Sequence, residues 1–328
     1  MDFHGGDDQK RTVKADKINV YADTQLYVSN QRVITWQGEL CGDGDIVFRN
    51  NKDAGATMLF TGKSTNYTGR VTITQQGSDA TPNSPTPEKF QFYLSNGSTF
   101  NGKYSGDDWY RSITFSKYPI LNNNKKDVVF AEPTRGILVQ EGVYFSLGGG
   151  TVTISNQVTF AGKIIIREGV GTLDLAGSAR FIDGNADTPP AANTNVVEVL
   201  AGNLRISSKT AADGLAIIFA EGAKLLIPAD TKAGYYNVKW DAPLTINSVS
   251  GKLPVTVENL ESSDVGNVVV PICTFNAAAA ANISEDVFMV SSDADDMRFK
   301  SLKKVVNDDT SVSYMATFGR FGSRIVIR

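Results

Sequence analysis

The sequence predicts an all-β fold in which short strands form the sides of a repeating coil, that is, a solenoid. From Ile18 onward, short β-rich runs alternate with Gly, Asn and Asp at intervals of about 8 to 12 residues, a spacing typical of all-β proteins. A helical period of about 3.6 residues is almost absent. The runs are too short and too close together for long hairpins. We therefore expect each strand to pair with its equivalents one turn above and one turn below.

The centre of the chain is its most regular part. Runs at 143–147, 151–154, 158–160 and 163–166 follow one another with only Gly or Asn corners between them. Glycine suits such corners because it adopts positive φ angles without steric cost. The residues that we expect in aligned inward rows are Val152, Ile154, Phe160, Ile165, Leu173 and Leu175.

The domain organisation follows from changes in this pattern. We expect a polar leader over 1–16, a coil over 17–251, and a β-rich cap or final turns over 252–328. Proline-containing segments near 76–88 and 183–194 are interpreted as loops inserted into the coil. A cap is expected because an open solenoid end exposes unpaired backbone groups. Although the chain has 328 residues, it does not require two domains, since each turn of a solenoid contacts only its neighbours.

One part of the chain resembles a known family. The runs 38–48 and 56–73 contain a Gly-x-Gly turn, two strands, and an Asn-Tyr-Thr-Gly corner at 66–69 that leads into another strand. This order resembles the autotransporter-associated β-strand repeat, and the corner is its most specific piece. The resemblance implies a right-handed parallel β-helix in the passenger of a bacterial exported protein. Passengers of this family have varied roles, so the repeat itself implies no activity.

Composition excludes several partners. The formal net charge is −3 and Lys and Arg form no long run, which argues against nucleic acid. Uninterrupted apolar stretches such as 277–281 are far shorter than the ~20 residues that cross a bilayer, so we predict no membrane span. The two cysteines, Cys41 and Cys273, would lie about ten turns or some 45 Å apart in a coil, so we expect no disulfide between them.

The expected location is extracellular or at the bacterial cell surface. This expectation comes from the family resemblance, because the segment 1–8 has neither the basic start nor the apolar stretch of a signal peptide. We therefore expect the targeting segment to lie outside the sequence.

Several patterns that carry chemistry elsewhere have a structural interpretation here. His4 is the only histidine and lies in the polar leader, so triad and Cys-His catalysis are not expected. Asp43 and Asp45 would point to one face about 7 Å apart, a spacing that suits glycoside hydrolysis, but they fall in a turn where polar residues are expected anyway. The acidic segment 293–296 lacks the spacing of a calcium loop. No metal or cofactor is predicted.

The best candidate binding cluster lies between 104 and 111. Aromatic side chains stack on the apolar face of a sugar ring, and carboxylates accept hydrogen bonds from its hydroxyls. The cluster consists of Tyr104, Asp107, Asp108, Trp109, Tyr110 and Arg111. The alternative is that its aromatic side chains only cover the coil beneath a loop.

The predicted function is adhesion or another extracellular interaction, with a glycan or a host surface component as partner and without catalysis. Two alternatives stay open. The first is a carbohydrate-active β-helix enzyme, a polysaccharide lyase or a glycoside hydrolase, because the same architecture carries such enzymes. The second is a purely structural spacer in a longer chain. Fold alone does not decide among the three.

Overall fold

The structure is a computed structural model that describes residues 10–28, 33–50, 56–75, 90–94, 100–181, 195–208, 210–211, 214–228, 239–240, 244–260 and 267–320. These residues form an all-β fold, as expected. The predicted loops near 76–88 and 183–194, and His4, lie outside the described residues. Within the described ranges, no helix has the length and apolar character needed to cross a membrane.

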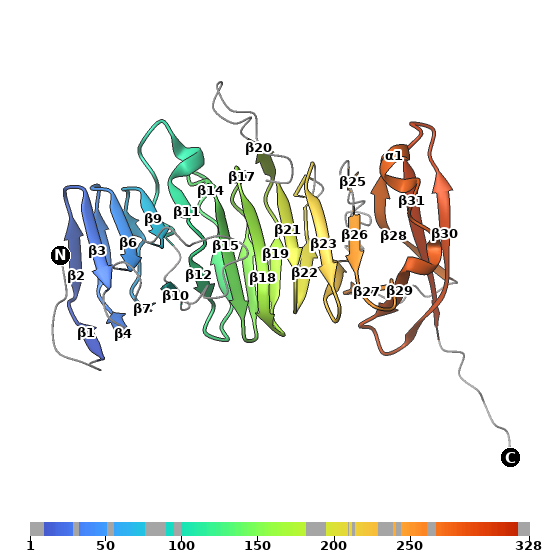
Figure 1. Ribbon diagram of the computed structural model, residues 1–328, viewed down its shortest axis with the longest axis horizontal. Helices are drawn as coiled ribbons and strands as arrows, with labels where there is room; N and C mark the ends of the chain where they lie inside the picture. Colours follow the sequence, from blue (N-terminus) through green and yellow to red (C-terminus); the bar gives the residue numbers. More distant parts are fainter. Residues whose placement is uncertain are drawn as a thin grey trace, which may run out of the picture.

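Three long parallel sheets make up most of the described structure (Figure 1). Sheet B contains, in spatial order, β1 (Arg11–Val13), β4 (Val33–Trp36), β7 (Ala56–Phe60), β10 (Phe90–Leu94), β12 (Ile120–Asn122), β15 (Gly142–Leu147), β18 (Lys163–Gly169), β21 (Val196–Val199), β23 (Ala216–Ala220) and β26 (Leu244–Asn247). Sheet A contains β3 (Thr24–Val28), β6 (Ile46–Asn50), β9 (Val71–Thr74), β11 (Ile113–Ser116), β14 (Ile137–Val139), β17 (Val158–Phe160) and β20 (Ala179–Phe181). Sheet D contains β13 (Val128–Phe130), β16 (Thr151–Ile154), β19 (Thr172–Leu175), β22 (Asn203–Ile206), β24 (Lys224–Pro228), β27 (Leu253–Glu258) and β29 (Phe288–Ser292).

The chain visits these sheets in a fixed order. From β11 to β22 it contributes one strand to sheet A, one to sheet B and one to sheet D, and then repeats; we call one such passage a circuit. Each strand from β11 to β19 pairs in parallel with the third strand after it. The predicted parallel pairing of strands one turn apart is therefore confirmed. Earlier in the chain the third side is a small parallel sheet, sheet C, formed by β2 (Lys17–Val20), β5 (Glu39–Gly42) and β8 (Asn66–Tyr67).

Parallel pairing without an offset builds straight rows of apolar side chains. Val152 pairs with Leu173, which pairs with Leu204, and all three side chains are buried in the main core. Ile154 and Leu175 form a second row beside them. Phe160, on sheet A, belongs to the same core. Five of the six predicted core residues are thus confirmed.

Ile165 is the exception. It is buried, but it belongs to a separate apolar cluster with Tyr118, Ile120 and Tyr144 rather than to the main core. Its chain neighbours Ile164 and Ile166 take the inward positions, because successive side chains of a strand point to opposite faces. Three consecutive isoleucines do not reveal which of them faces inward, so the prediction of an inward Ile165 was wrong.

The C-terminal part ends in a different kind of sheet. Strands β27 and β29 still extend sheet D, whereas β28 (Asn267–Phe275), β31 (Val312–Arg320) and β30 (Met297–Val306) pair antiparallel in sheet E, next to β25 (Lys239–Trp240). The inner side chains of β28 and β31 join the main core. Figure 1 shows these strands at the end of the molecule opposite β1 and β2. The helical elements are η1 (Trp109–Arg111), α1 (Ala277–Ala280) and η2 (Glu285–Val287).

The structure bears on two further expectations, the absence of a disulfide and the extent of the polar leader. Cys41 and Cys273 are both buried and both free, which confirms that they do not form a disulfide. Strand β1 lies inside the segment 1–16 that the sequence assigns to a polar leader, and it pairs with β4 in sheet B.

Shortening a side chain in an inward row should destabilise the protein measurably. Leu173 is fully buried between Val152 and Leu204, so Leu173→Ala leaves a cavity and should lower the unfolding free energy by about 2 to 5 kcal/mol. Urea unfolding followed by circular dichroism measures this. A change below about 0.5 kcal/mol, the level of an ordinary surface substitution, would contradict the placement of Leu173 in the core.

Candidate functional site

The predicted cluster lies in the segment between β10 and β11 and includes η1. In this segment Tyr104 is buried, Asp108 and Tyr110 are partly buried, and Asp107, Trp109 and Arg111 are exposed. The structure brings together Tyr104, Asp108 and Arg111. It therefore joins half of the predicted cluster into one network.

Asp108 is the centre of that network. Its Oδ1 accepts a hydrogen bond from the Tyr104 hydroxyl, and its Oδ2 accepts one from Arg111 Nε at 2.7 Å. Arg70 contributes a second cation, with Nη1 3.0 Å from the same Oδ2. The Tyr104 hydrogen bond and the two arginines lower the pKa of Asp108, although partial burial opposes them. Asp108 is therefore an ionised acceptor whose two oxygens are already engaged.

The other predicted residues lie outside this network. Trp109 keeps 37% of its surface exposed, and neither it nor Asp107 contributes to the Asp108 network. The backbone of Tyr110 lies against Gly136, where an added Cβ atom would approach the Tyr110 Cα to 2.6 Å. Sugar binding by the whole cluster stays a prediction.

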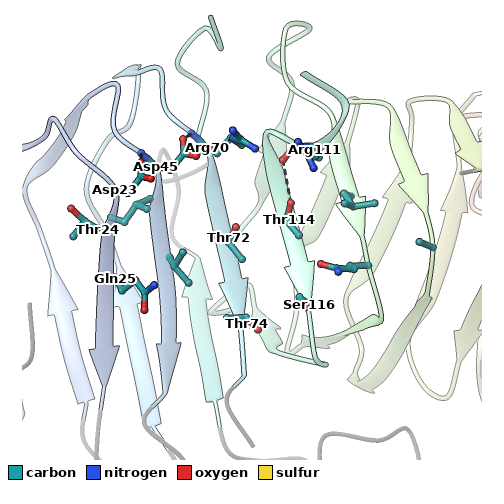
Figure 2. A pocket seen from close by; sticks show the side chains of 15 residues that line it. Asp23, Thr24, Gln25, Asp45, Arg70, Thr72, Thr74, Arg111, Thr114 and Ser116 are labelled. Carbon is teal, nitrogen blue, oxygen red and sulfur yellow. Dashed lines mark hydrogen bonds and ion pairs between the residues drawn. The ribbon is translucent and has the colours of Figure 1, made fainter. Parts of the chain in front are cut away.

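A groove of about 630 Å³ runs beside this network, across the outer face of sheet A. Its floor is built from the outward side chains of successive strands, which pair directly with one another. One row consists of Gln25, Val47, Thr72, Thr114 and Leu138. Figure 2 shows the hydroxyl and amide groups of this floor on neighbouring strands, with Thr74 and Ser116 further along β9 and β11. Seven of the fifteen lining residues have neutral polar side chains, four have apolar ones and four have charged ones.

Charged side chains form one rim of the groove, where the strands of sheet A begin (Figure 2). Asp23 Oδ1 accepts a hydrogen bond from the backbone N–H of Asp45 at 3.3 Å. Asp45 in turn accepts one from the backbone N–H of Arg70 at 3.0 Å, and its Oδ2 lies 3.0 Å from Arg70 Nε. Since Arg70 also reaches Asp108, a chain of polar contacts runs from Asp23 to Arg111.

The structure shows that Asp43 and Asp45, whose spacing suits glycoside hydrolysis, have different surroundings. Asp43 is exposed, whereas Asp45 lines the groove and forms its ion pair with Arg70. Glycoside hydrolysis needs one carboxyl group that donates a proton and a second that stays ionised. The contacts of Asp45 with the side chain and the backbone N–H of Arg70 give it a structural role at the start of β9.

A buried arginine supports the network from below. Arg135 is 0% exposed, and its guanidinium donates to four backbone carbonyls: Nε to Gly102, Nη1 to Gly69 and Ser112, and Nη2 to Tyr67, at 2.6 to 3.4 Å. It also lies 5.7 Å from the ring centres of Tyr67 and Tyr104. Burial lowers the pKa of Arg135 to about 10 and raises that of Tyr104 to about 12. At neutral pH Arg135 remains charged.

The corner at 66–69 is stabilised by contacts of the Tyr67 side chain. The Tyr67 side chain is fully buried, and its hydroxyl donates to the carbonyl oxygens of Gly44 at 2.6 Å and Arg70 at 2.7 Å. Burial raises the pKa of Tyr67, so the hydroxyl stays protonated. A side chain at Gly69 is excluded, because its Cβ atom would lie 2.2 Å from the Gly44 oxygen.

Sequence reasoning missed the groove, Arg70 and Arg135. The only signal for the groove is the alternation of threonine and serine with apolar residues in β9 and β11. That alternation identifies an outer face but not which strands lie side by side. Arg135 follows a Pro-Thr pair and looks in the sequence like any surface residue. Its role depends on carbonyls from three other parts of the chain.

The acidic segment 293–296 has structural contacts. Asp293 Oδ2 accepts a hydrogen bond from the backbone N–H of Asn259 at 3.0 Å, and Asp296 lies 3.8 Å from Arg320. In the portion of the chain that the structure describes, no group of three or more His, Cys, Asp or Glu side chains is arranged to hold a metal ion.

Comparison with known proteins gives no further assignment: no protein-family model matches the chain, and no curated protein matches it either. The resemblance of the 66–69 corner to the autotransporter-associated repeat therefore stays a prediction. What the site does has to be argued from its own geometry.

Replacing Arg135 by an apolar side chain of similar length should be strongly destabilising. Arg135→Met removes the guanidinium donor from the buried carbonyl oxygens of Gly102, Gly69 and Tyr67, whereas that of Ser112 keeps the Val71 N–H, and this should lower the unfolding free energy by about 3 kcal/mol or more. The matched control is Arg111→Met, because exposed ion pairs contribute no more than about 1 kcal/mol. Equal effects of the two substitutions on urea unfolding would show that Arg135 does not hold the corners together.

Asp108 should make stability depend on pH in the acid range. Its folded-state pKa is lowered, so its stabilising contribution is complete above the unfolded value of about 3.9 and is lost as the pH falls through the folded value. Asp108→Asn should flatten the acid limb of a plot of unfolding free energy against pH. Asp107→Asn is the control, since that exposed side chain is not part of the network. An acid limb unchanged in Asp108→Asn would contradict the assignment.

Proposed function

We propose that this chain is a right-handed parallel β-helix of the autotransporter-passenger kind, a bacterial protein that is secreted or displayed at the cell surface and binds glycan without cleaving it. Two features support the architecture. The strands recur in the order of sheets A, B and D with parallel pairing between circuits. The family-like corner at 66–69 has a fully buried tyrosine and a glycine that admits no side chain.

The groove on sheet A is the observation that carries the binding proposal. Its floor presents hydroxyl and amide groups at regular intervals, because strands of a sheet lie about 4.8 Å apart. Hydroxyl and amide groups both donate and accept hydrogen bonds, as the hydroxyls of a sugar do. Val47 and Leu138 add apolar surface to the same row. A long, shallow surface of this composition suits an extended glycan better than a compact cofactor.

The rim favours binding over hydrolysis. A general acid in a glycosidase keeps its proton near neutral pH because its pKa is raised. Asp108 has the opposite property, since its hydrogen bond from Tyr104 and its two arginines lower its pKa. Asp45 forms an ion pair with Arg70 at 3.0 Å. Both carboxylates therefore act as anchors for arginine side chains.

A screen of glycan arrays, combined with an assay for new reducing ends on the same sugars, tests this proposal against its two alternatives. Binding without release of reducing ends is the expected result. Release of reducing ends that Asp45→Asn abolishes would establish the enzyme alternative. Absence of binding to every glycan on the array would favour the structural spacer.

Removing hydroxyl groups from the groove floor should weaken binding. The double variant Thr72→Val, Thr114→Val keeps the β-branched shape of both side chains but deletes two neighbouring hydroxyls, and it should lower the affinity for a bound glycan by about tenfold. Thr153→Val is the matched control, because Thr153 lies on β16 of sheet D, away from the groove. Isothermal titration calorimetry measures both. Equal affinity of parent and double variant would remove the groove floor from the binding site.

A further inference from the structure

We propose, on the basis of the glycan-binding function proposed above, that the groove takes a linear glycan that carries carboxylate groups. In this proposal Arg111 binds the carboxylate together with Arg70, and Asp108 is the positioning residue that holds both guanidinium groups. The glycan lies along the groove, across the strands of sheet A. The argument rests on which nitrogen atoms of the two arginines are occupied.

Arg111 is held at one edge only. Its Nε donates to Asp108 Oδ2 at 2.7 Å, and its guanidinium lies 5.9 Å from the centre of the Tyr110 ring. Its side chain is 46% exposed and lines the groove. Among the described residues, neither Nη1 nor Nη2 of Arg111 has a hydrogen bond or an ion pair. The outer edge of this guanidinium is therefore open to a ligand.

Arg70 is held more completely and lies beside it. Its Nε pairs with Asp45 and its Nη1 pairs with Asp108, both at 3.0 Å. Since Arg70 and Arg111 share the same oxygen of Asp108, their guanidinium groups lie close to one another. Figure 2 shows both side chains at the same rim, just before the neighbouring strands β9 and β11. Arg70 pairs with both Asp45 and Asp108, whereas Arg111 pairs with Asp108 alone and shares that carboxylate with Arg70.

Carboxylate is the group that matches this geometry. A guanidinium presents its N–H groups in a planar fork that fits the two oxygens of a carboxylate, and such charge-assisted pairs are roughly twice as strong as neutral hydrogen bonds. A hydroxyl group would accept a hydrogen bond from only one nitrogen, and it would add no attraction between opposite charges. Fixing the fork in advance by Asp108 and Tyr110 also reduces the entropy lost on binding.

The rest of the groove sets the direction of the ligand. Asp23 and Asp45 lie at the end of the rim away from Arg111, where a second carboxylate would be repelled and sugar hydroxyls would be accepted. The row from Gln25 to Leu138 crosses five strands, a span of about 19 Å at ~4.8 Å per strand. This length fits an oligosaccharide of several residues with a carboxylate at the Arg111 end.

The test compares neutral oligosaccharides that end in a single uronic acid residue with the same oligomers after chemical reduction of that carboxyl group. The parent protein should bind the carboxylated oligomers at least about tenfold more tightly, and the difference should shrink as the salt concentration rises. Arg111→Gln should abolish the preference by weakening binding of the carboxylated oligomers. Lys303→Gln, on the exposed face of β30, removes the same charge far from the groove and should change neither affinity.

The role of Asp108 has its own readout. Asp108→Asn should weaken binding of the carboxylated oligomers and spare the reduced ones, and its effect should not add to that of Arg111→Gln, because both act on one guanidinium. Equal affinity of the parent for both kinds of oligomer would overturn the carboxylate proposal but leave glycan binding intact. Failure to bind either kind, or any other glycan, would overturn both proposals.

Discussion

Parallel pairing of each strand with its equivalent in the next circuit is the constraint on which the rest of the structure depends. It turns single apolar positions into continuous inward rows, such as the row through Val152, Leu173 and Leu204. It applies equally to the outer face, where Thr72 lies beside Thr114. Core and groove therefore both result from the same backbone hydrogen bonding. One face of each strand contributes to the core, and the opposite face contributes to the groove.

The corners between strands contain buried polar backbone groups that this stacking does not pair. Backbone carbonyls at a corner do not take part in a sheet, yet some of them are buried beneath the next circuit, where an unpaired oxygen is unfavourable. Arg135 resolves this for four carbonyls at once, and Asn156 continues the support by donating to the carbonyl of Arg135 at 2.8 Å. The candidate site lies directly above this support, since Tyr104 contacts both Arg135 and Asp108. A rigid base allows the rim to hold charged groups in fixed positions.

The candidate site shows how much of a site can be predicted from the residue types of one short segment. Tyr104, Asp108 and Arg111 were identified from composition alone, and they do form one network. The groove beside them was not identified, because its residues come from β3, β6, β9, β11 and β14. Trp109, the most prominent residue of the segment, is not among the residues that line the groove. Proximity along the chain predicted the local network and could not predict a surface assembled across circuits.

The sequence by itself determined the all-β class, the parallel pairing between turns, most of the inward rows, and the separation of the two cysteines. These properties follow from alternation, strand length and glycine corners, which are local. The tertiary structure decided the rest: the outward placement of Ile165, the partners of Arg135, and the alignment of threonines and arginines along the groove. The physical reason is register. A shift of one residue reverses the face of every side chain, and the unequal spacing of the strands along the chain hides that register from the sequence.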